Sequence, residues 1–320
     1  MGKGIDMLFH IVLLLVGFFI LIQGSTFFVD GASSVAEELK IPKMLIGIVI
    51  IAFGTCLPEF AVSIKAIMSG NGNIVVGNVI GSNILNILLI LGCCSLIHPF
   101  KVKKKALKDE IPFLSFMTFL FALLLADSLF NKSVSFSRID GLIVLTCFGF
   151  FLYYLFFLSK EGKEESKKKK KVSLKKAIIL LLVGLVGVVL GSNFVVDSAV
   201  SLAEQLGVSE RFIALTAVAL GTSLPELVTS ITALKKKEFD FVLGNVIGSN
   251  FFNIGMVMGL PVSLFGGIQG ITFSFIDLIV LVLAPCLLFL FSFRDFKISR
   301  KEGASFLIIL VLYYSYLFIN

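Results

Sequence analysis

The chain has 320 residues, of which 57% are hydrophobic and only 15% are charged, and it carries a formal net charge of +7. Its mean hydropathy is +1.02. A soluble domain cannot hide so much apolar surface behind so few polar residues, so the composition predicts a polytopic membrane protein. The positive charge does not indicate a nucleic-acid partner, because most Lys and Arg residues lie in short segments between apolar runs.

About 20 apolar residues cross a bilayer as a helix. The first apolar run is too long for a signal peptide and no small-residue cleavage site follows it, so we interpret it as a span. The first and sixth runs exceed the length needed, and steep tilting would accommodate them. The ten expected spans lie near residues 7–36, 44–68, 73–97, 111–129, 139–159, 177–204, 212–234, 241–264, 273–293 and 304–319.

Basic residues gather after the first, third, fifth, seventh and ninth spans. Because cytoplasmic loops carry the excess of Lys and Arg, we expect both termini outside the plasma (inner) membrane and the 160–176 loop in the cytoplasm. This loop, which contains five consecutive lysines, is interpreted as a solvated topology determinant, with electrostatic lipid binding as the alternative. The five cysteines lie in apolar runs without metal spacing, which argues against disulfides and thiolate metal sites.

Residues 24–92 align with residues 191–259 without a gap, at a constant offset of 167. The shared positions are glycines, asparagines, serines, a proline and a glutamate, so chance similarity of apolar segments does not explain them. Five spans separate equivalent points, and an odd number reverses the orientation of the second copy. We therefore expect an all-α membrane protein of ten helices in two inverted five-helix repeats, residues 1–160 and 177–320, joined by a Lys-rich linker at 161–176.

One duplicated motif places a proline and a carboxylate inside an apolar span: Gly-Thr-Cys-Leu-Pro-Glu at 54–59 and Gly-Thr-Ser-Leu-Pro-Glu at 221–226. Proline frees the carbonyl four residues earlier from the helical ladder. An ionisable side chain at bilayer depth indicates a functional site. We expect Glu59 and Glu226 to face each other with a cation between them.

Helical spacing aligns further polar residues with these two acids. The stripes are Thr55, Glu59 and Ser63; Thr222, Glu226 and Ser230; Asn78, Ser82 and Asn86; and Asn245, Ser249 and Asn253. Oxygen-bearing side chains suit hard cations, and Ca²⁺ takes 6–8 oxygens in irregular geometry. Zinc and copper prefer nitrogen or sulfur, which these stripes lack apart from the neighbouring Cys56.

Each feature also has a structural interpretation. A proline can serve as a kink, and an asparagine can join two helices. The glycine pairs at 77/81 and 244/248 are small-xxx-small pairs, for which we expect close helix packing. Asp30 and Asp197 lie near the ends of spans, where capping or interfacial roles are expected. The structural interpretation explains single residues, but it does not explain an oxygen-rich set duplicated in opposite orientation.

The two glutamates carry two negative charges, which one divalent cation neutralises. Without that cation the carboxylates repel each other, so protons and monovalent cations compete for the site. Such competition is the chemistry of an exchanger and needs neither covalent catalysis nor a cofactor. A cation channel and a structural or lipid-interacting membrane protein are the alternatives of other classes.

The paired G-[TS]-x-L-P-E and G-N-x-x-G-S-N-x-x-N blocks resemble the α-repeats of the calcium/cation antiporter superfamily, and the whole chain looks most like a compact prokaryotic sodium/calcium exchanger. The resemblance implies antiport of Ca²⁺ against Na⁺ by alternating access, with H⁺ or K⁺ as alternative counter-ions. It implies that spans one and six slide against the other eight. No obligatory protein partner is expected besides the bilayer and the transported ions.

The resemblance also implies roles for individual residues. Glu59 and Glu226 would be the central carboxylates. The other expected ligands are the carbonyls of Thr55, Thr222, Ala52 and Ala219, the hydroxyls of Ser82, Ser249 and Ser223, and the adjacent amides of Asn86 and Asn253.

Two positions depart from the family pattern. Cys56 stands where many members have serine, and a neutral thiol is a poor sodium ligand, which puts one sodium site in doubt. Asn86 and Asn253 are both asparagine where some relatives have an aspartate, which leaves two titratable carboxylates at the centre.

Overall fold

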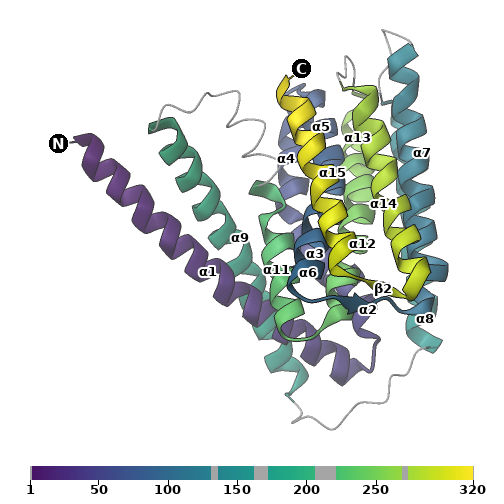
Figure 1. Ribbon diagram of the computed structural model, residues 1–320, viewed down its shortest axis with the longest axis horizontal. Helices are drawn as coiled ribbons and strands as arrows, with labels where there is room; N and C mark the ends of the chain where they lie inside the picture. Colours follow the sequence, from purple (N-terminus) through teal and green to yellow (C-terminus); the bar gives the residue numbers. More distant parts are fainter. Residues whose placement is uncertain (1, 131–135, 162–171, 206–220, 269–272, 320) are drawn as a thin grey trace.

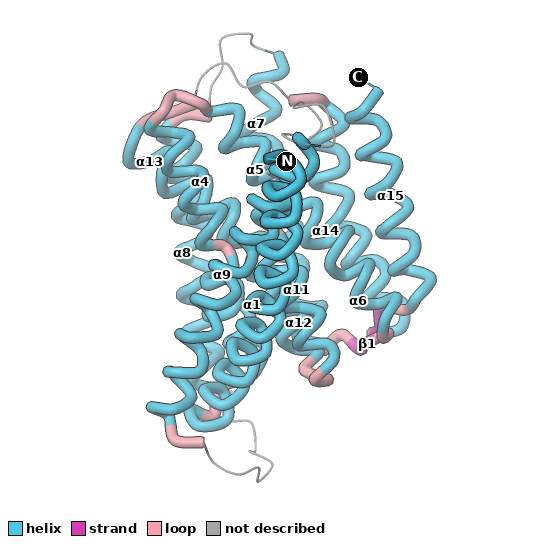
Figure 2. Tube along the Cα trace, turned by 90° about the vertical axis from the view of Figure 1, so that its left-hand side faces the viewer, coloured by secondary structure: helices cyan, strands magenta, loops and turns pink. Residues whose placement is uncertain are grey.

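The computed structural model describes residues 2–130, 136–161, 172–205, 221–268 and 273–319, and nearly all of them are helical (Figures 1 and 2). The α-helices in chain order are α1 (Gly2–Leu39), α2 (Lys43–Ile46), α3 (Ala52–Thr55), α4 (Leu57–Met68), α5 (Gly72–Leu85), α6 (Gly92–Ile97), α7 (Ile111–Phe130), α8 (Arg138–Glu161), α9 (Leu174–Gln205), α11 (Leu224–Lys235), α12 (Phe239–Phe252), α13 (Leu260–Phe265), α14 (Phe275–Asp295) and α15 (Arg300–Ile319). Four π-helical segments lie between them: η1 (Gly47–Ile51), η2 (Asn86–Leu91), η3 (Ala106–Glu110) and η4 (Asn253–Gly259).

Within the described residues, eight helices are long and apolar enough to cross a membrane, and a bent pair, Lys43–Thr55 with Leu57–Met68, makes a ninth. These nine correspond to nine of the expected spans. The remaining expected span, 212–234, is described only from residue 221 onward, where α11 occupies its second part. The protein is therefore a multi-pass helical membrane protein.

Helices α1 and α9 lie side by side and run obliquely to the rest of the bundle (Figure 1). Glycines allow their backbones to meet. A Cβ added at Gly24 would lie 2.6 Å from the backbone of Gly187, and one added at Gly184 would overlap the backbone of Phe28. Close approach through small residues is a common way for membrane helices to associate, because lipid supplies no hydrophobic force between them.

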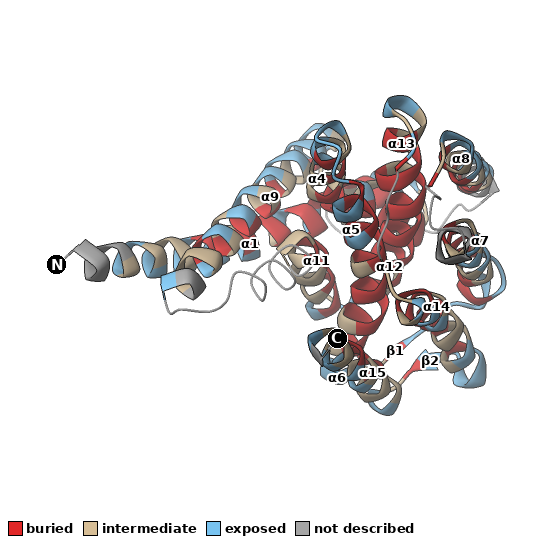
Figure 3. Ribbon diagram, turned by 90° about the horizontal axis from the view of Figure 1, so that it is seen from above, coloured by how far each residue is buried: buried red, intermediate tan, exposed pale blue. Residues whose placement is uncertain are grey.

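The buried centre of the bundle is formed by α12 with its continuation η4 and by α5 (Figure 3). Helix α12 packs against η1, α3 and α11, and α5 packs against α4 and α14. Outer helices expose large apolar side chains, such as Phe19 on α1 and Phe150 on α8, at 66% and 67%. Apolar surface of this kind is suited to lipid.

The equivalent elements of the two halves have matching bounds. Helices α4 and α11 start and end at positions 167 residues apart, and so do α5 and α12. A short antiparallel pair joins β1 (Phe100–Lys101) to β2 (Lys297–Ile298), and a single bridge joins Phe136 to Ile268. Strand β1 follows α6 and β2 precedes α15, whereas Phe136 precedes α8 and Ile268 follows α13. Both contacts therefore join a segment of the first half to a segment of the second half.

Candidate functional site

Two helices of the bundle begin inside apolar segments, each directly after a break. Cys56 precedes α4 with φ −77° and ψ −1°, and Ser223 precedes α11 with nearly the same angles, −84° and 1°. In both helices a proline occupies the first turn, where its missing N–H has no helical partner to lose. The break in the first half bends the span by 46°. Both halves therefore create a helix N-terminus in the interior of the bundle.

Glu59 and Glu226 lie in the first turns of these two helices, where the helix dipole favours a negative charge. Each side chain is only 1% exposed. The carboxylates are close enough to repel each other electrostatically. The Thr222 side chain lies beside Glu59, whereas Thr55 and Cys56 lie beside Glu226, so each acid faces side chains of the opposite half.

Four buried side chains at the centre lack hydrogen-bond partners among the described residues. Both carboxylate oxygens of Glu59 and Glu226 are unpartnered, and so are the amide oxygen and nitrogen of Asn86 and Asn253. The two asparagines are each 1% exposed and begin the π-helical segments η2 and η4. A buried polar group without a partner costs about 1–3 kcal/mol, and a charged one costs more. A cation bound by these oxygens would offset that cost.

Two further asparagines connect the halves crosswise. The Asn78 amide donates to the Glu59 carbonyl and to the Ser63 hydroxyl, both at 3.3 Å, and its oxygen accepts from Thr222 at 3.3 Å. Asn78 therefore holds the acid-bearing helix of its own half and a threonine of the other half.

Asn245 repeats this arrangement with the halves exchanged. Its amide donates to the Glu226 carbonyl at 3.3 Å and to Ser230 at 3.0 Å, and its oxygen accepts from Thr55 at 3.2 Å. The repeat and the helical stripes singled out both asparagines as candidate site residues, and the structural alternative was that an asparagine joins two helices. Their contacts join spans that only the three-dimensional arrangement brings together.

The two halves differ where Cys56 corresponds to Ser223. The Ser223 hydroxyl donates to the Ser82 hydroxyl at 3.4 Å. The Cys56 thiol instead points to the backbone carbonyl of Ser249 at 3.8 Å, and the buried Ser249 hydroxyl has no partner among the described residues. The sequence difference therefore leaves one hydroxyl of the second half unpaired.

The remaining expected ligands are placed as follows. Ala52 is buried, and its carbonyl accepts from the Cys56 N–H at 3.0 Å and from the Thr55 hydroxyl at 3.3 Å. Ala219 lies outside the described residues. The carbonyl of Gly221, freed by Pro225, accepts from Ser192 of α9 at 3.4 Å.

The glycine pairs give a divided result. Gly244 and Gly248 pack against the backbones of Met44 and Ile48, as expected for close helix contact. A Cβ at Gly77 would meet no described atom within 4 Å.

Among the described residues no group of three or more His, Cys, Asp and Glu side chains could hold a metal. A cation at the centre would depend on amide, hydroxyl and carbonyl oxygens in addition to the two carboxylates, which favours a hard cation.

A multi-pass helical protein with paired carboxylates at interrupted helices in its buried centre belongs to the class of membrane ion transporters. Residues 9–157 and 176–319 match the sodium/calcium exchanger protein family. The putative antiporter CaxA of Alkalimonas amylolytica is 35% identical over 98% of this chain and 99% of its own length. The sodium/calcium exchanger MaX1 of Methanosarcina acetivorans is 32% identical over 95% of this chain and 96% of its own.

A solved structure gives the same result. The sodium-calcium exchanger NCX_Mj, soaked with 10 mM Na⁺ and zero Ca²⁺, superposes with a TM-score of 0.84 at 34% identity, over 97% of this chain and 99% of that one. The chain belongs to the sodium/calcium exchanger family, within the calcium/cation antiporters of the prokaryotic type. Its relatives are transporters and not enzymes.

Proposed function

We propose that this protein is a secondary-active antiporter that exchanges Ca²⁺ for Na⁺ across the plasma membrane by alternating access. The observation that carries the proposal is the central set of unpartnered side chains: Glu59, Glu226, Asn86 and Asn253 are buried at equivalent positions of the two halves, and none of their side-chain oxygen or nitrogen atoms has a hydrogen-bond partner among the described residues. Family membership supports a calcium/cation exchanger. The assignment of Na⁺ as its counter-ion is part of the proposal.

The two carboxylates would bind Ca²⁺ and Na⁺ alternately, because either ion neutralises charge that burial otherwise makes costly. The carbonyls of Thr55 and Thr222 would complete the calcium site. The groups assigned to the flanking sodium sites are the carbonyls of Ala52 and Ala219 and the hydroxyls of Ser82, Ser249 and Ser223. The Cys56 thiol is a poor ligand for Na⁺. The flanking sodium site that contains Ser249 would therefore bind Na⁺ more weakly than the site that contains Ser82.

The proposed architecture has ten spans in two inverted repeats, residues 1–160 and 177–320, with the Lys-rich linker 161–176 between them. Matching helix bounds and the crosswise contacts of Asn78 and Asn245 support two structurally equivalent halves. The distribution of basic residues supports termini on the outside and a cytoplasmic 160–176 loop. Helices α1 and α9 would move together against the remaining helices.

The test is a flux measurement in proteoliposomes containing the full-length protein. Vesicles loaded with Na⁺ and diluted into Na⁺-free medium should accumulate labelled Ca²⁺, and dissipation of the Na⁺ gradient should stop the uptake. Vesicles loaded with K⁺, or with an imposed proton gradient, should accumulate little. Uptake driven equally well by a K⁺ or H⁺ gradient would overturn the sodium assignment. Uptake that follows voltage and needs no counter-ion gradient would indicate a channel instead of an antiporter.

A further inference from the structure

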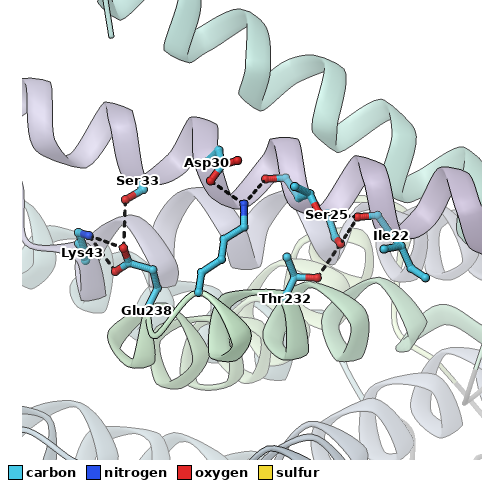
Figure 4. A network of polar contacts seen from close by, with 9 residues as sticks. Ile22, Ser25, Asp30, Ser33, Lys43, Thr232 and Glu238 are labelled. Atoms are coloured by element: carbon cyan, nitrogen blue, oxygen red, sulfur yellow. Dashed lines mark hydrogen bonds and ion pairs between the residues drawn. The ribbon is translucent and has the colours of Figure 1, made fainter. Parts of the chain in front are cut away.

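A set of polar contacts joins the second half of α1 to the turn between α11 and α12 (Figure 4). Lys43, four residues beyond α1, contacts both carboxylate oxygens of Glu238 at 2.7 and 2.8 Å. Ser33 of α1 donates to Glu238 at 3.4 Å. Lys236 forms an ion pair with Asp30 of α1. Asp30 therefore binds a side chain of the second half and does not cap a helix.

The same interface extends along α1. Lys236 also donates to the backbone carbonyl of Thr26 at 3.0 Å, and the hydroxyls of Ser25 and Thr232 lie 2.7 Å apart. Lys236 and Glu238 are both more than two-thirds buried. We call this set the α1 latch: Ser25, Thr26, Asp30, Ser33, Lys43, Thr232, Lys236 and Glu238.

The equivalent turn of the first half has the same shape but different chemistry. Asn71 directly precedes α5 with φ −95° and ψ 66°, and Glu238 directly precedes α12 with φ −91° and ψ 64°. The positions equivalent to Lys236 and Glu238 are Ser69 and Asn71, which carry no charge. Asp197 of α9, the equivalent of Asp30, is retained, but this turn offers it no cation. Among the described residues, the ionic latch is therefore found in one half only.

We propose that the α1 latch biases the conformational equilibrium of the protein. It stabilises the state in which α1 is docked on the α11–α12 turn relative to the state in which α9 is docked on the α4–α5 turn. This role of the latch rests on the proposed alternating access. In an inverted repeat the two docked states would close opposite faces of the membrane. The turn after α11 is expected on the cytoplasmic side, so the latch favours the state that is closed to the cytoplasm.

The size of this bias follows from the contacts. Partly exposed ion pairs contribute modestly, and two pairs with their hydrogen bonds shift a two-state equilibrium by about three- to tenfold. The apparent affinity of a ligand that binds from one face is lowered when part of the protein is closed to that face. Weakening the latch should therefore lower the Ca²⁺ concentration for half-maximal transport at the cytoplasmic face, and leave it unchanged or raise it at the outer face.

The experiment exchanges residues between the two turns. The variant Lys236→Ser/Glu238→Asn gives the second turn the residues that the first turn already accommodates. Lys235→Ser is the matched control, because it removes a lysine from the same helix end at an exposed position outside the latch. A second variant, Ser69→Lys, supplies Asp197 with a cation at an exposed site, and Ser69→Asp is its control with the opposite charge.

Two readouts separate the latch from the proposed function. The first is hydrogen exchange of residues 232–242, which requires no transport and should be faster in the double variant than in Lys235→Ser. The second is half-maximal Ca²⁺ at each face, measured in inside-out and right-side-out vesicles. We expect about a three- to tenfold decrease at the cytoplasmic face for both the double variant and Ser69→Lys, and no decrease for either control.

Equal changes at both faces would overturn the proposal, because they would indicate altered ion affinity instead of a shifted equilibrium. So would a double variant that matches Lys235→Ser in both readouts. If the double variant does not fold, Ser69→Lys decides the outcome in transport. If the unmodified protein moves no Ca²⁺ in any gradient, the exchange function fails, and hydrogen exchange alone decides whether the latch holds α1.

Discussion

The hydroxyl of Thr222 lies 3.3 Å from the amide oxygen of Asn78, and the two residues belong to opposite halves of the chain. Thr55 and Asn245 form the reciprocal contact at 3.2 Å. Because each asparagine also holds the backbone carbonyl of a central glutamate, the position of either acid depends on a residue from the other half. The two acids are therefore positioned as a pair.

We expect Asn78→Ala and Asn245→Ala to impair the protein to a similar extent. Each substitution removes the hydrogen bonds that join a threonine of the other half to a serine and a glutamate carbonyl of the same half, which should destabilise the fold by about 1–3 kcal/mol and slow calcium uptake. Thermal unfolding in detergent and flux in proteoliposomes would measure the two effects. A large effect of one variant with none of the other would contradict equivalent roles in the two halves.

We expect Glu59→Gln and Glu226→Gln to abolish calcium uptake while the protein still folds. Glutamine keeps the size of the side chain but removes the charge that attracts the cation. Glu110→Gln is the control, since Glu110 is similarly buried, at 3% exposed, and lies at the end of η3, outside the site. Stabilisation by Ca²⁺ against thermal unfolding should disappear in the first two variants and persist in the third. Uptake that survives either substitution at the centre would refute the site assignment.

We expect Cys56→Ser to strengthen sodium binding. A hydroxyl at this position gives the unpartnered Ser249 hydroxyl a neighbour like the one that Ser82 has in Ser223, and it replaces a soft ligand by a hard one. The Na⁺ concentration that half-inhibits calcium binding should fall, and the dependence on Na⁺ should become steeper. Ser223→Cys should act in the opposite direction. Identical sodium dependence in all three proteins would show that this position does not limit sodium binding.

Acid should inhibit the exchanger. As the pH falls, protons occupy the two central carboxylates, the site loses negative charge, and Ca²⁺ binds less tightly. Initial calcium uptake under a fixed Na⁺ gradient should therefore decrease between about pH 8 and about pH 5, with a rise in the Ca²⁺ concentration for half-maximal uptake. A flat profile over this range would mean that the glutamates do not exchange protons in the working site.

The contact between α1 and α9 should tolerate no added side chain. Gly184→Ala would place a methyl group against the backbone of Phe28, which cannot yield as a flexible side chain can. We expect a loss of about 1–3 kcal/mol in stability, from forcing closely packed backbones apart. Gly149→Ala on α8 is the control, because an added Cβ there meets no atom within 4 Å. Equal thermal stability of the two variants would argue against close glycine packing.

The sequence predicted the features that follow from local rules and from the duplication. Apolar length located nine of the spans, and Pro58 and Pro225 marked the two helix starts at the centre. The helical stripes included the two glutamates and the two asparagines whose side chains at the centre are buried and unpartnered, because the 3.6-residue period fixes which residues share a face.

Contacts between distant elements were not predictable in the same way. The Asn78–Thr222 contact depends on how two spans cross, and the Lys236–Asp30 ion pair depends on where α1 ends relative to a turn in the other half. The π-helical segments η2 and η4 also gave no signal in sequence, because one extra residue in a turn leaves the apolar pattern almost unchanged.

The short pairing of β1 with β2 has a consequence for biosynthesis. Phe100 can pair with Ile298 only after almost the whole chain has left the ribosome. Likewise, Asn78 can accept the hydrogen bond from Thr222 only after residue 222 has been synthesised. Until then the first half carries buried polar groups and strand edges without partners, which exposes it to misassembly and quality control. A nascent chain stalled before residue 222 should therefore be a substrate for membrane proteases, even though every helix of its first half has been inserted.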